Sequence, residues 1–314
     1  MNRLGLSDNR RLAAILDCEP ELLQTIIRNK SQYYGSFFRD KDDGTKREIT
    51  PPFKPLLAIQ HNIKEYLKTK LAWTQVVHGG VPKRSIVTNA RPHVNKVQVV
   101  NLDISKFFPS VKPVFVQSAL ERAGCAVPVA SLLMELVTYK DGLPQGSPTS
   151  TIIGNLVLEP MDSKFMAFCR KHGFIYTRYV DDVTISGNVD MRPCRQGLID
   201  IIRRAGYIVS DHKVQFTNRD NPQVVTGLVV NDRLRPTKDF LQELRGTIRR
   251  CWPENEGLSN VAAETGLLPH ELLRKLRGRV SHVKSVDRAS GRKIRGLMVK
   301  IFDKSQRIKY VPVF

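Results

Sequence analysis

The chain has 314 residues with 50 Lys and Arg against 30 Asp and Glu, which gives a formal net charge of +20. Its composition, 41% hydrophobic and 25% charged, is typical of a globular protein and excludes a disordered or collagen-like chain. No apolar run approaches the roughly 18 residues of a membrane span, and the five scattered cysteines suit no disulfide framework. We therefore expect a cytoplasmic protein with reduced thiols and no membrane partner.

The excess positive charge indicates what kind of partner the protein has. A net charge of about 2 to 8 is enough to keep a small domain soluble, so +20 exceeds that need. Residues 233–314 hold 19 Lys and Arg against 8 Asp and Glu, over half of the net charge. Nucleic acid is therefore favoured as the partner over an anionic membrane surface.

The first half of the chain begins with apolar residues at helical spacing. Residues 8–30 are predicted to be helical, with a break at Pro20. Tyr33 to Thr50 is strand-like around the turn Asp42-Asp43-Gly44. Pro55 fits the first turn of an amphipathic helix whose inward residues are Leu56, Ile59, Ile63, Tyr66 and Leu67.

Three apolar strand candidates follow, at 97–104, 174–186 and 223–230, between segments of helical pattern. This alternation predicts an α/β protein with one sheet under several helices. The tail from Arg233 onward is predicted to be helical. On one continuous helix its basic residues would share a face, which is either a solvated surface or an RNA-binding one: Arg274, Arg277, Lys284 and Arg288.

Two places concentrate negative charge within this basic chain. At period two, Val100, Leu102 and Ile104 face one side of the first strand and Asn101 and Asp103 the other, so the strand presents a carboxylate near its end. An Asp that caps the next helix is the alternative reading.

The second acidic place is Asp181-Asp182, flanked by β-branched and aromatic residues that predict a hairpin with the pair at its tip. Adjacent carboxylates raise each other's pKa unless a cation lies between them. An acidic solvent turn is the alternative. Together with Asp103, the pair offers the oxygen ligands that two Mg²⁺ ions about 3.5–4 Å apart require.

Further motifs accompany these carboxylates. With them, the sequence resembles bacterial retron reverse transcriptases over about residues 31–290, and the motifs occur in the order typical of that family. The motifs are Lys46 to Pro51, His78-Gly79, Asn89-Ala90-Arg91-Pro92-His93, Asn101 to Ser110, Leu143 to Ser150, Tyr179-Val180-Asp181-Asp182, Val225-Thr226-Gly227 and Gly278 to Asp287. Val180 stands where retron enzymes commonly have alanine, and Gly80 replaces a commoner aromatic residue.

The resemblance implies roles for individual residues. Asp103 and Asp181 would bind both Mg²⁺ ions, with Asp182 assisting. Phe108 aligns with the aromatic gate that excludes a ribose 2′-hydroxyl, with Phe107 in the core; an exchange of these two roles is the alternative.

The resemblance also implies a nucleotide site and an RNA site. The nucleotide would contact Gln145, Gly146 and Arg47, with either Lys41 or Lys46 as a second positive group. Lys213 aligns with a lysine that helps to protonate or neutralise pyrophosphate. Residues of the two retron signatures would serve RNA recognition or packing beneath the RNA: Asn89, His93, Val225, Thr226 and Gly227.

The fold implied is an α/β right-hand polymerase with an α+β palm of split βαβ topology. Its expected parts are an N-terminal helical extension at 1–30, fingers at 31–95, a palm at 96–232 and a basic helical thumb at 233–314. No ribonuclease H segment is expected after the thumb, so host ribonuclease H would act in trans.

The reaction implied is RNA-directed synthesis of DNA with two Mg²⁺ ions as cofactors and deoxynucleoside triphosphates as substrates. A cognate noncoding RNA would supply template and primer, and the product would be branched RNA-linked single-stranded DNA, made for antiphage defence with a separate effector protein. One alternative is a reverse transcriptase of another bacterial lineage with conventional priming. Another is an RNA-binding scaffold or regulator whose polymerase site is dispensable.

Overall fold

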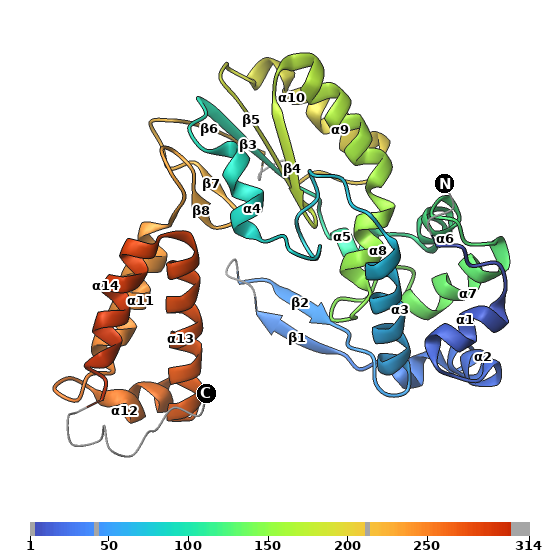
Figure 1. The fold of residues 1–314 in the computed structure, drawn as a ribbon, viewed down its shortest axis with the longest axis horizontal. Helices are drawn as coiled ribbons and strands as arrows, with labels where there is room; N and C mark the ends of the chain where they lie inside the picture. The colour runs from blue at the N-terminus through green and yellow to red at the C-terminus, as the bar shows by residue number, and fades with distance from the viewer. Residues whose placement is uncertain (1–3, 41–43, 211–213, 303–314) are drawn as a thin grey trace. The chain divides into compact units, whose positions relative to one another are not determined.

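The computed structural model describes residues 4–40, 44–210 and 214–302. Contacts within the chain divide it into two compact units, an N-terminal unit of residues 1–218 and a C-terminal unit of residues 219–314 (Figure 1). None of the described helices is long and apolar enough to cross a membrane. Residues 219–232, which we predicted to belong to the palm, fall in the C-terminal unit, and the predicted subdomain boundaries stay predictions.

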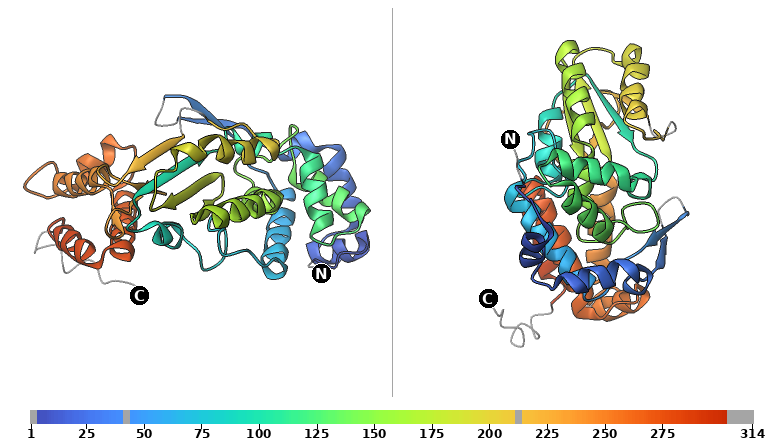
Figure 2. Two further views of the ribbon diagram at one scale, coloured as in Figure 1. Left: turned by 90° about the horizontal axis from the view of Figure 1, so that it is seen from above. Right: turned by 90° about the vertical axis from the view of Figure 1, so that its right-hand side faces the viewer.

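The N-terminal unit begins with two short helices, α1 (Asn9–Leu16) and α2 (Pro20–Arg28). The side chain of Asp8 caps α1 by accepting a hydrogen bond from the Arg11 amide at 2.9 Å, and Pro20 is the first residue of α2. The predicted break at Pro20 is thus confirmed. Both helices contact α7 (Val127–Val137), and Figure 2 shows these blue helices beside the green ones of this unit.

A two-stranded hairpin follows, made of β1 (Phe37–Asp40) and β2 (Lys46–Ile49) in antiparallel register. This confirms the strand-like segment, although Asp42 and Asp43 of its turn lie outside the described residues. Helix α3 (Leu56–Lys70) starts directly after Pro55, as predicted. Its inward face is formed by Leu56, Ile59, Gln60, Ile63 and Leu67, with Tyr66 partly buried.

The central sheet of this unit has the strand order β4-β5-β3-β6, with every neighbouring pair antiparallel. Its strands are β3 (Gln98–Asp103), β4 (Ile175–Tyr179), β5 (Asp182–Gly187) and β6 (Gln215–Asn218). Strands β3 and β4 therefore run parallel with β5 between them, and β5 and β6 run parallel with β3 between them. This is the expected split βαβ topology, present twice and interleaved.

The third strand candidate, 223–230, was wrong as a member of this sheet. It forms β7 (Val224–Val225) and β8 (Leu228–Val229), which join β9 (Arg235–Pro236) in a separate sheet of the C-terminal unit. Thr226 and Gly227 have φ of 44° and 79°, the conformation of a tight type I′ turn, so the apolar run folds back on itself. The fourth strand of the central sheet is β6, which we did not predict.

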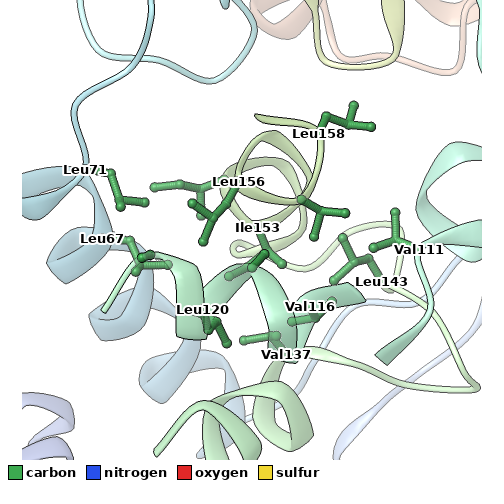
Figure 3. Packing of buried hydrophobic residues seen from close by; sticks show 14 of the residues in the cluster. Leu67, Leu71, Val111, Val116, Leu120, Val137, Leu143, Ile153, Leu156 and Leu158 are labelled. Atoms are coloured by element: carbon green, nitrogen blue, oxygen red, sulfur yellow. The ribbon is translucent and has the colours of Figure 1, made fainter. Parts of the chain in front are cut away.

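Helices surround this sheet and bury one continuous apolar core. Helix α9 contacts β4 and packs on α10, and the core between α3, α6, α7 and α8 is seen in Figure 3. The helices not yet given are α4 (Ile86–Ala90), α5 (Phe107–Ser110), α6 (Pro113–Arg122), α8 (Ser150–Val157), α9 (Glu159–His172) and α10 (Arg195–Arg204), with 3₁₀ turns η1 (Lys30–Tyr33), η2 (Arg91–His93) and η3 (Arg192–Cys194).

The C-terminal unit is helical beyond its small sheet, as predicted, and has a core of its own. Its helices are α11 (Lys238–Arg250), α12 (Gly257–Glu264), α13 (Pro269–Val286) and α14 (Arg288–Val299). Arg274, Arg277 and Lys284 are exposed on α13, opposite its buried leucines and valines.

The prediction that the four basic residues share one face of a single helix was wrong for Arg288. Asp287 leaves the helical conformation at φ −134° and ψ 102°, and its side chain accepts hydrogen bonds from the amides of Ala289 and Ser290. It therefore caps a new helix, and Arg288 begins α14 instead of continuing the face of α13.

Helices α13 and α14 approach closely at Gly291. A Cβ atom on Gly291 would lie 2.4 Å from the Cα of Lys284, whereas a Cβ on Gly296 of the same helix meets nothing within 4 Å. We predict that Gly291→Ala destabilises the unit by about 2–3 kcal/mol, since the helices must separate, while Gly296→Ala stabilises it by up to about 1 kcal/mol. Thermal unfolding of both variants checks this; equal melting temperatures would contradict the close packing.

Candidate active site

Two strands bring the predicted carboxylates to one end of the central sheet. Asp103 ends β3 and is the direct cross-strand partner of Asp182, the first residue of β5. Tyr179 of β4 pairs with Asp182, so the hairpin closes through a two-residue turn, Val180–Asp181. The predicted hairpin is present, with its tip one residue earlier than the Asp pair. Asp103 and Asp182 are thus cross-strand neighbours, and Asp181 lies in the turn directly before Asp182.

Ser210 forms hydrogen bonds with both the backbone and the side chain of Asp103. The Ser210 amide donates to the Asp103 carbonyl at 3.0 Å, and the Ser210 hydroxyl to the carboxylate at 3.2 Å. The next helix, α5, is preceded at its N-cap by Lys106. Asp103 therefore does not cap that helix, which removes the structural alternative left open from the sequence.

The three carboxylates have the right donor chemistry for magnesium. Carboxylate oxygens are the ligands that Mg²⁺ prefers, and it commonly uses one or two of them together with substrate phosphates. Within the part of the chain that the structure describes, no three His, Cys, Asp or Glu side chains form a ready-made metal cluster. The donor chemistry of Asp103, Asp181 and Asp182 fits Mg²⁺, and their role as its ligands stays a prediction.

The two phenylalanines after Asp103 differ in exposure. Phe107 is 2% exposed and its ring packs 5.8 Å from that of Tyr207 in the core. Phe108 is partly exposed, with its ring 5.3 Å from that of Phe107. Of the two rings, Phe108 is the one with exposed surface, and its role as the sugar gate stays a prediction.

The Gln145–Gly146 turn joins the hairpin β1–β2 to the unit. The Thr50 amide donates to the Gln145 carbonyl at 2.6 Å, and Gly146 has a φ of 105°. A Cβ on Gly146 would lie 3.0 Å from Ile49 of β2, so glycine allows this close approach. The side-chain oxygen of Gln145 is buried without a hydrogen-bond partner among the described residues, and a ligand donor would satisfy it.

Arg47 lies on β2 directly opposite Arg39 of β1, and both side chains are exposed. By the period-two rule both lie on the strand face of Ile49, which contacts Gly146. Like charges directly opposite each other are destabilising unless an anion neutralises them. The register therefore adds Arg39, which we did not predict, to the phosphate-binding candidates.

Of the three candidate lysines, the structure describes Lys46. Lys46 is exposed on the other face of β2, opposite Asp40. Lys41 and Lys213 lie outside the described residues, so the choice between Lys41 and Lys46 and the role of Lys213 stay predictions.

The first retron signature, residues 89–93, is buried against the β4–β5 hairpin. Asn89 and His93 are both 0% exposed. The His93 ring bonds the hydroxyl of Ser186 of β5 at 2.7 Å and that of Thr177 of β4 at 2.8 Å. Neither side chain faces solvent, so any effect of these two residues on RNA binding is indirect, through packing beneath the surface.

Burial makes His93 a source of acid sensitivity. Desolvation lowers the pKa of His93 to about 3, while the unfolded chain takes up this proton near pH 6.5. His93 therefore stabilises the fold fully above about pH 6.5, and this contribution falls as the pH drops toward 3. From pH 7 to pH 5 we expect a loss of about 2 kcal/mol from this residue.

The variant His93→Gln should be less stable at pH 7 but should lose less stability on acidification, as followed by chemical unfolding at each pH. Burial also lowers the pKa of His78 to about 4, so part of the wild-type slope should remain. An unchanged slope in the variant would contradict the assignment.

The second signature segment forms the β7–β8 hairpin. Val225 is 0% exposed, while Thr226 and Gly227 form its turn. Val225 thus packs inside the C-terminal unit, and only the turn residues can present atoms to a ligand.

The comparisons with known proteins agree with this geometry. The sequence pattern of the family described as "Reverse transcriptase (RNA-dependent DNA polymerase)" matches residues 39–248, which is most of the chain and includes all three carboxylates. The protein belongs to the reverse transcriptase family. The family prediction made from the sequence motifs is confirmed.

Its curated relatives are retron reverse transcriptases. The Retron Mx65 reverse transcriptase of Myxococcus xanthus is 32% identical over 243 residues, covering 71% of this chain and 57% of the relative. The Retron Ec86 reverse transcriptase of Escherichia coli is 27% identical over 279 residues, covering 87% and 83%. The chain spans less than three fifths of the length of Mx65 and of Mx162, a second relative from Myxococcus xanthus.

Among solved structures, telomerase from Candida albicans aligns with a TM-score of 0.46 at 12% identity, over 90% of this chain and 64% of that one.

This member of the reverse transcriptase family also has a groove of about 840 Å³ that begins at Ser105, two residues after Asp103, although none of the three carboxylates lines it. Lys106, Lys112 and Lys140 line it, with Asp141 as the acidic residue among them. Such a surface attracts phosphate groups.

The site also contains an arginine that we did not predict. Arg178 lies between Thr177 and Tyr179 in the sequence, and its pattern gives it no role beyond that of a strand residue. The one sequence signal for its role is a charged residue within a strand that is otherwise predicted to be buried.

Proposed function

We propose that the protein is an RNA-directed DNA polymerase of the retron type. It copies a structured noncoding RNA, which supplies both template and primer, into branched RNA-linked single-stranded DNA. The observation that carries the proposal is the pairing of Asp103 with Asp182 beside the Val180–Asp181 turn, within a chain of the reverse transcriptase family.

The carboxylates would hold two Mg²⁺ ions, Asp103 and Asp181 as direct ligands and Asp182 in support. When bound, these ions lower the pKa of the attacking hydroxyl and neutralise charge on the leaving pyrophosphate. The residues of the chain then have positioning tasks: Arg47 and Arg39 hold the triphosphate, Gln145 contacts the nucleotide, and Phe108 lies against the sugar. Positioning and electrostatics supply most of the rate in phosphoryl transfer.

The proposal divides the chain into the parts of a right-handed polymerase, with fingers at 31–95, a palm at 96–232 and a thumb at 233–314. The exposed Arg274, Arg277 and Lys284 on α13, with Arg288 on α14, would contact the phosphates of an RNA stem or RNA–DNA duplex. Such binding weakens steeply as salt rises.

The retron assignment further includes cytoplasmic action, antiphage defence with a separate effector protein, and removal of the template by host ribonuclease H in trans. The curated relatives support the retron reverse transcriptase part of this assignment.

Sequencing the nucleic acid that copurifies with the protein, after ribonuclease treatment, tests the proposal. We expect DNA complementary to a noncoding RNA and joined to it at a 2′-hydroxyl. A product extended from an ordinary 3′-end would favour a reverse transcriptase of another lineage.

The scaffold alternative is tested separately, by replacing both Asp181 and Asp182 with Ala in cells challenged with phage. Retained protection without DNA synthesis would support a scaffold, and joint loss of protection and DNA would support the retron proposal.

A further inference from the structure

Arg178 is a buried cation two residues before the turn that carries Asp181. Its side chain is 0% exposed. Its Nε and Nη2 donate to the two carboxylate oxygens of Asp162 on α9, at 2.7 and 2.6 Å. Its Nη1 donates to the side-chain oxygen of Asn155 on α8 at 2.7 Å and to the carbonyl of Val180 at 2.6 Å. One side chain thus connects two helices to the catalytic turn.

The charge of Arg178 is balanced within the core. Burial alone lowers the pKa of Arg178, but the adjacent Asp162 carboxylate outweighs it and holds the pKa above its ordinary value, so the guanidinium stays charged. Asp162 accepts a third hydrogen bond, from the Tyr176 hydroxyl at 2.5 Å. A buried ion pair adds little net stability compared with apolar packing, so stability alone is a weak explanation for this cluster.

The turn that Arg178 contacts is in a costly conformation. Val180 has a φ of 61°, which a β-branched residue rarely adopts and which costs about 1–3 kcal/mol. Such a conformation persists only where the surroundings enforce it. The carbonyl of Val180 is the group that receives the Arg178 hydrogen bond, directly before Asp181.

The 78–79 segment, which packs on the turn, is held by the same cluster. A Cβ on Gly79 would lie 2.5 Å from the Val180 side chain, so the 78–79 segment packs directly on the turn. Asn155 donates to the Gly79 carbonyl at 2.7 Å, and the His78 amide donates to the Arg178 carbonyl at 2.8 Å. Arg178 therefore holds the Val180 carbonyl directly, while Asn155 holds the Gly79 segment that packs on the Val180 side chain.

We propose that Arg178 is a positioning residue for the metal site. Anchored by Asp162 and Asn155, it holds the Val180 carbonyl and so fixes where the Asp181 carboxylate stands relative to Asp103 and Asp182. This inference rests on the proposed function, because it assigns those carboxylates to metal binding.

A merely structural role and a positioning role have different consequences. If the cluster only stabilises the fold, its loss lowers the melting temperature and changes metal affinity no more than any equally destabilising substitution. If it positions Asp181, metal affinity falls in a protein that is still folded and still binds RNA–DNA. Mutation of a residue that orients a metal ligand without binding the metal itself typically lowers metal affinity about 10–100-fold.

The test uses two variants. Arg178→Lys keeps the charge but cannot make the same hydrogen bonds as the guanidinium, and Asn155→Ala removes the side chain that bonds both Arg178 and the Gly79 carbonyl. Leu23→Ala is the control for stability, because Leu23 is buried in α2 and is not part of the site. Each protein is bound to an RNA–DNA duplex with a terminated primer and the next nucleotide. Mn²⁺ affinity is then measured from the free-ion EPR signal, with duplex affinity and melting temperature recorded alongside.

We expect Arg178→Lys and Asn155→Ala to weaken Mn²⁺ binding about tenfold with less than about a twofold change in duplex affinity, while Leu23→Ala lowers only the melting temperature. Wild-type Mn²⁺ affinity in a folded Arg178→Lys protein, or an equal loss in Leu23→Ala, would overturn the proposal. If Arg178→Lys does not fold, Asn155→Ala decides by the same criterion. Because the readout is metal binding, a wild-type protein that makes no DNA would reject the proposed function without deciding this inference.

Discussion

Asp181→Asn should reduce DNA synthesis by at least about 1,000-fold, which corresponds to about 4 kcal/mol of lost transition-state stabilisation. The substitution keeps the size of the side chain but removes the negative charge from the Val180–Asp181 turn. Asp103→Asn should have an effect of the same order, since the two carboxylates act on the same ions. Single-turnover incorporation of one nucleotide on an RNA template measures the rate.

Two controls separate lost chemistry from lost binding. The affinity for RNA–DNA duplex should not weaken in Asp181→Asn, because the phosphate-binding surfaces are unchanged. Asp200→Asn on α10 makes the same charge change outside the strands that carry the site and should keep wild-type rates. A loss of less than tenfold in both Asp103→Asn and Asp181→Asn would exclude these residues as the main metal ligands.

Phe108→Val should relax sugar discrimination. The partly exposed ring of Phe108 would lie against the sugar of the incoming nucleotide, and valine leaves room for a 2′-hydroxyl. We expect the preference for deoxynucleotides over ribonucleotides, as a ratio of kcat/KM values, to fall by about 100-fold, or about 2.7 kcal/mol. Competing single-nucleotide incorporation with both sugars measures the ratio.

Phe107→Val is the matched control, since it removes the same ring from the neighbouring position. Phe107 is 2% exposed, so its loss should lower the melting temperature through a cavity and leave sugar preference close to that of the wild type. If Phe107→Val relaxes discrimination and Phe108→Val does not, the two roles are exchanged.

The parts of the site that the sequence predicts are those set by short-range periodicity. The alternation along residues 98–103 places Asp103 on the less buried face of β3, as the structure shows. Likewise the β-branched residues around Asp181-Asp182 form a hairpin. These features depend on neighbours along the chain, which a sequence displays directly.

Pairing between segments that are distant in the sequence is harder to predict from the sequence. Strand β6 has a polar pattern, Gln-Phe-Thr-Asn, and is a strand because β3 offers it a partner. Arg39 becomes a candidate only through its register opposite Arg47. The helix break at Asp287 depends on one capping side chain, and the helical spacing of the basic residues on both sides of it gives no sign of the break.

The buried cluster around Arg178 illustrates the same limit. Arg178, Asp162 and Asn155 come from three consecutive elements, the helices α8 and α9 and the strand β4, with separations of 16 and 23 residues between Arg178 and its two partners. Nothing in the local pattern of any one of them indicates the other two. Only the packing of α8 and α9 against the sheet brings their polar groups together.

Primer extension on an RNA template of defined, non-repetitive sequence tests the central claim most directly. With purified protein, Mg²⁺ and all four deoxynucleoside triphosphates, we predict DNA whose sequence is complementary to the template, and no DNA from the protein in which Asp181 and Asp182 are both Ala. The absence of DNA from the wild-type protein, or DNA unrelated to the template sequence, would contradict the assignment of Asp103, Asp181 and Asp182 to RNA-directed polymerisation.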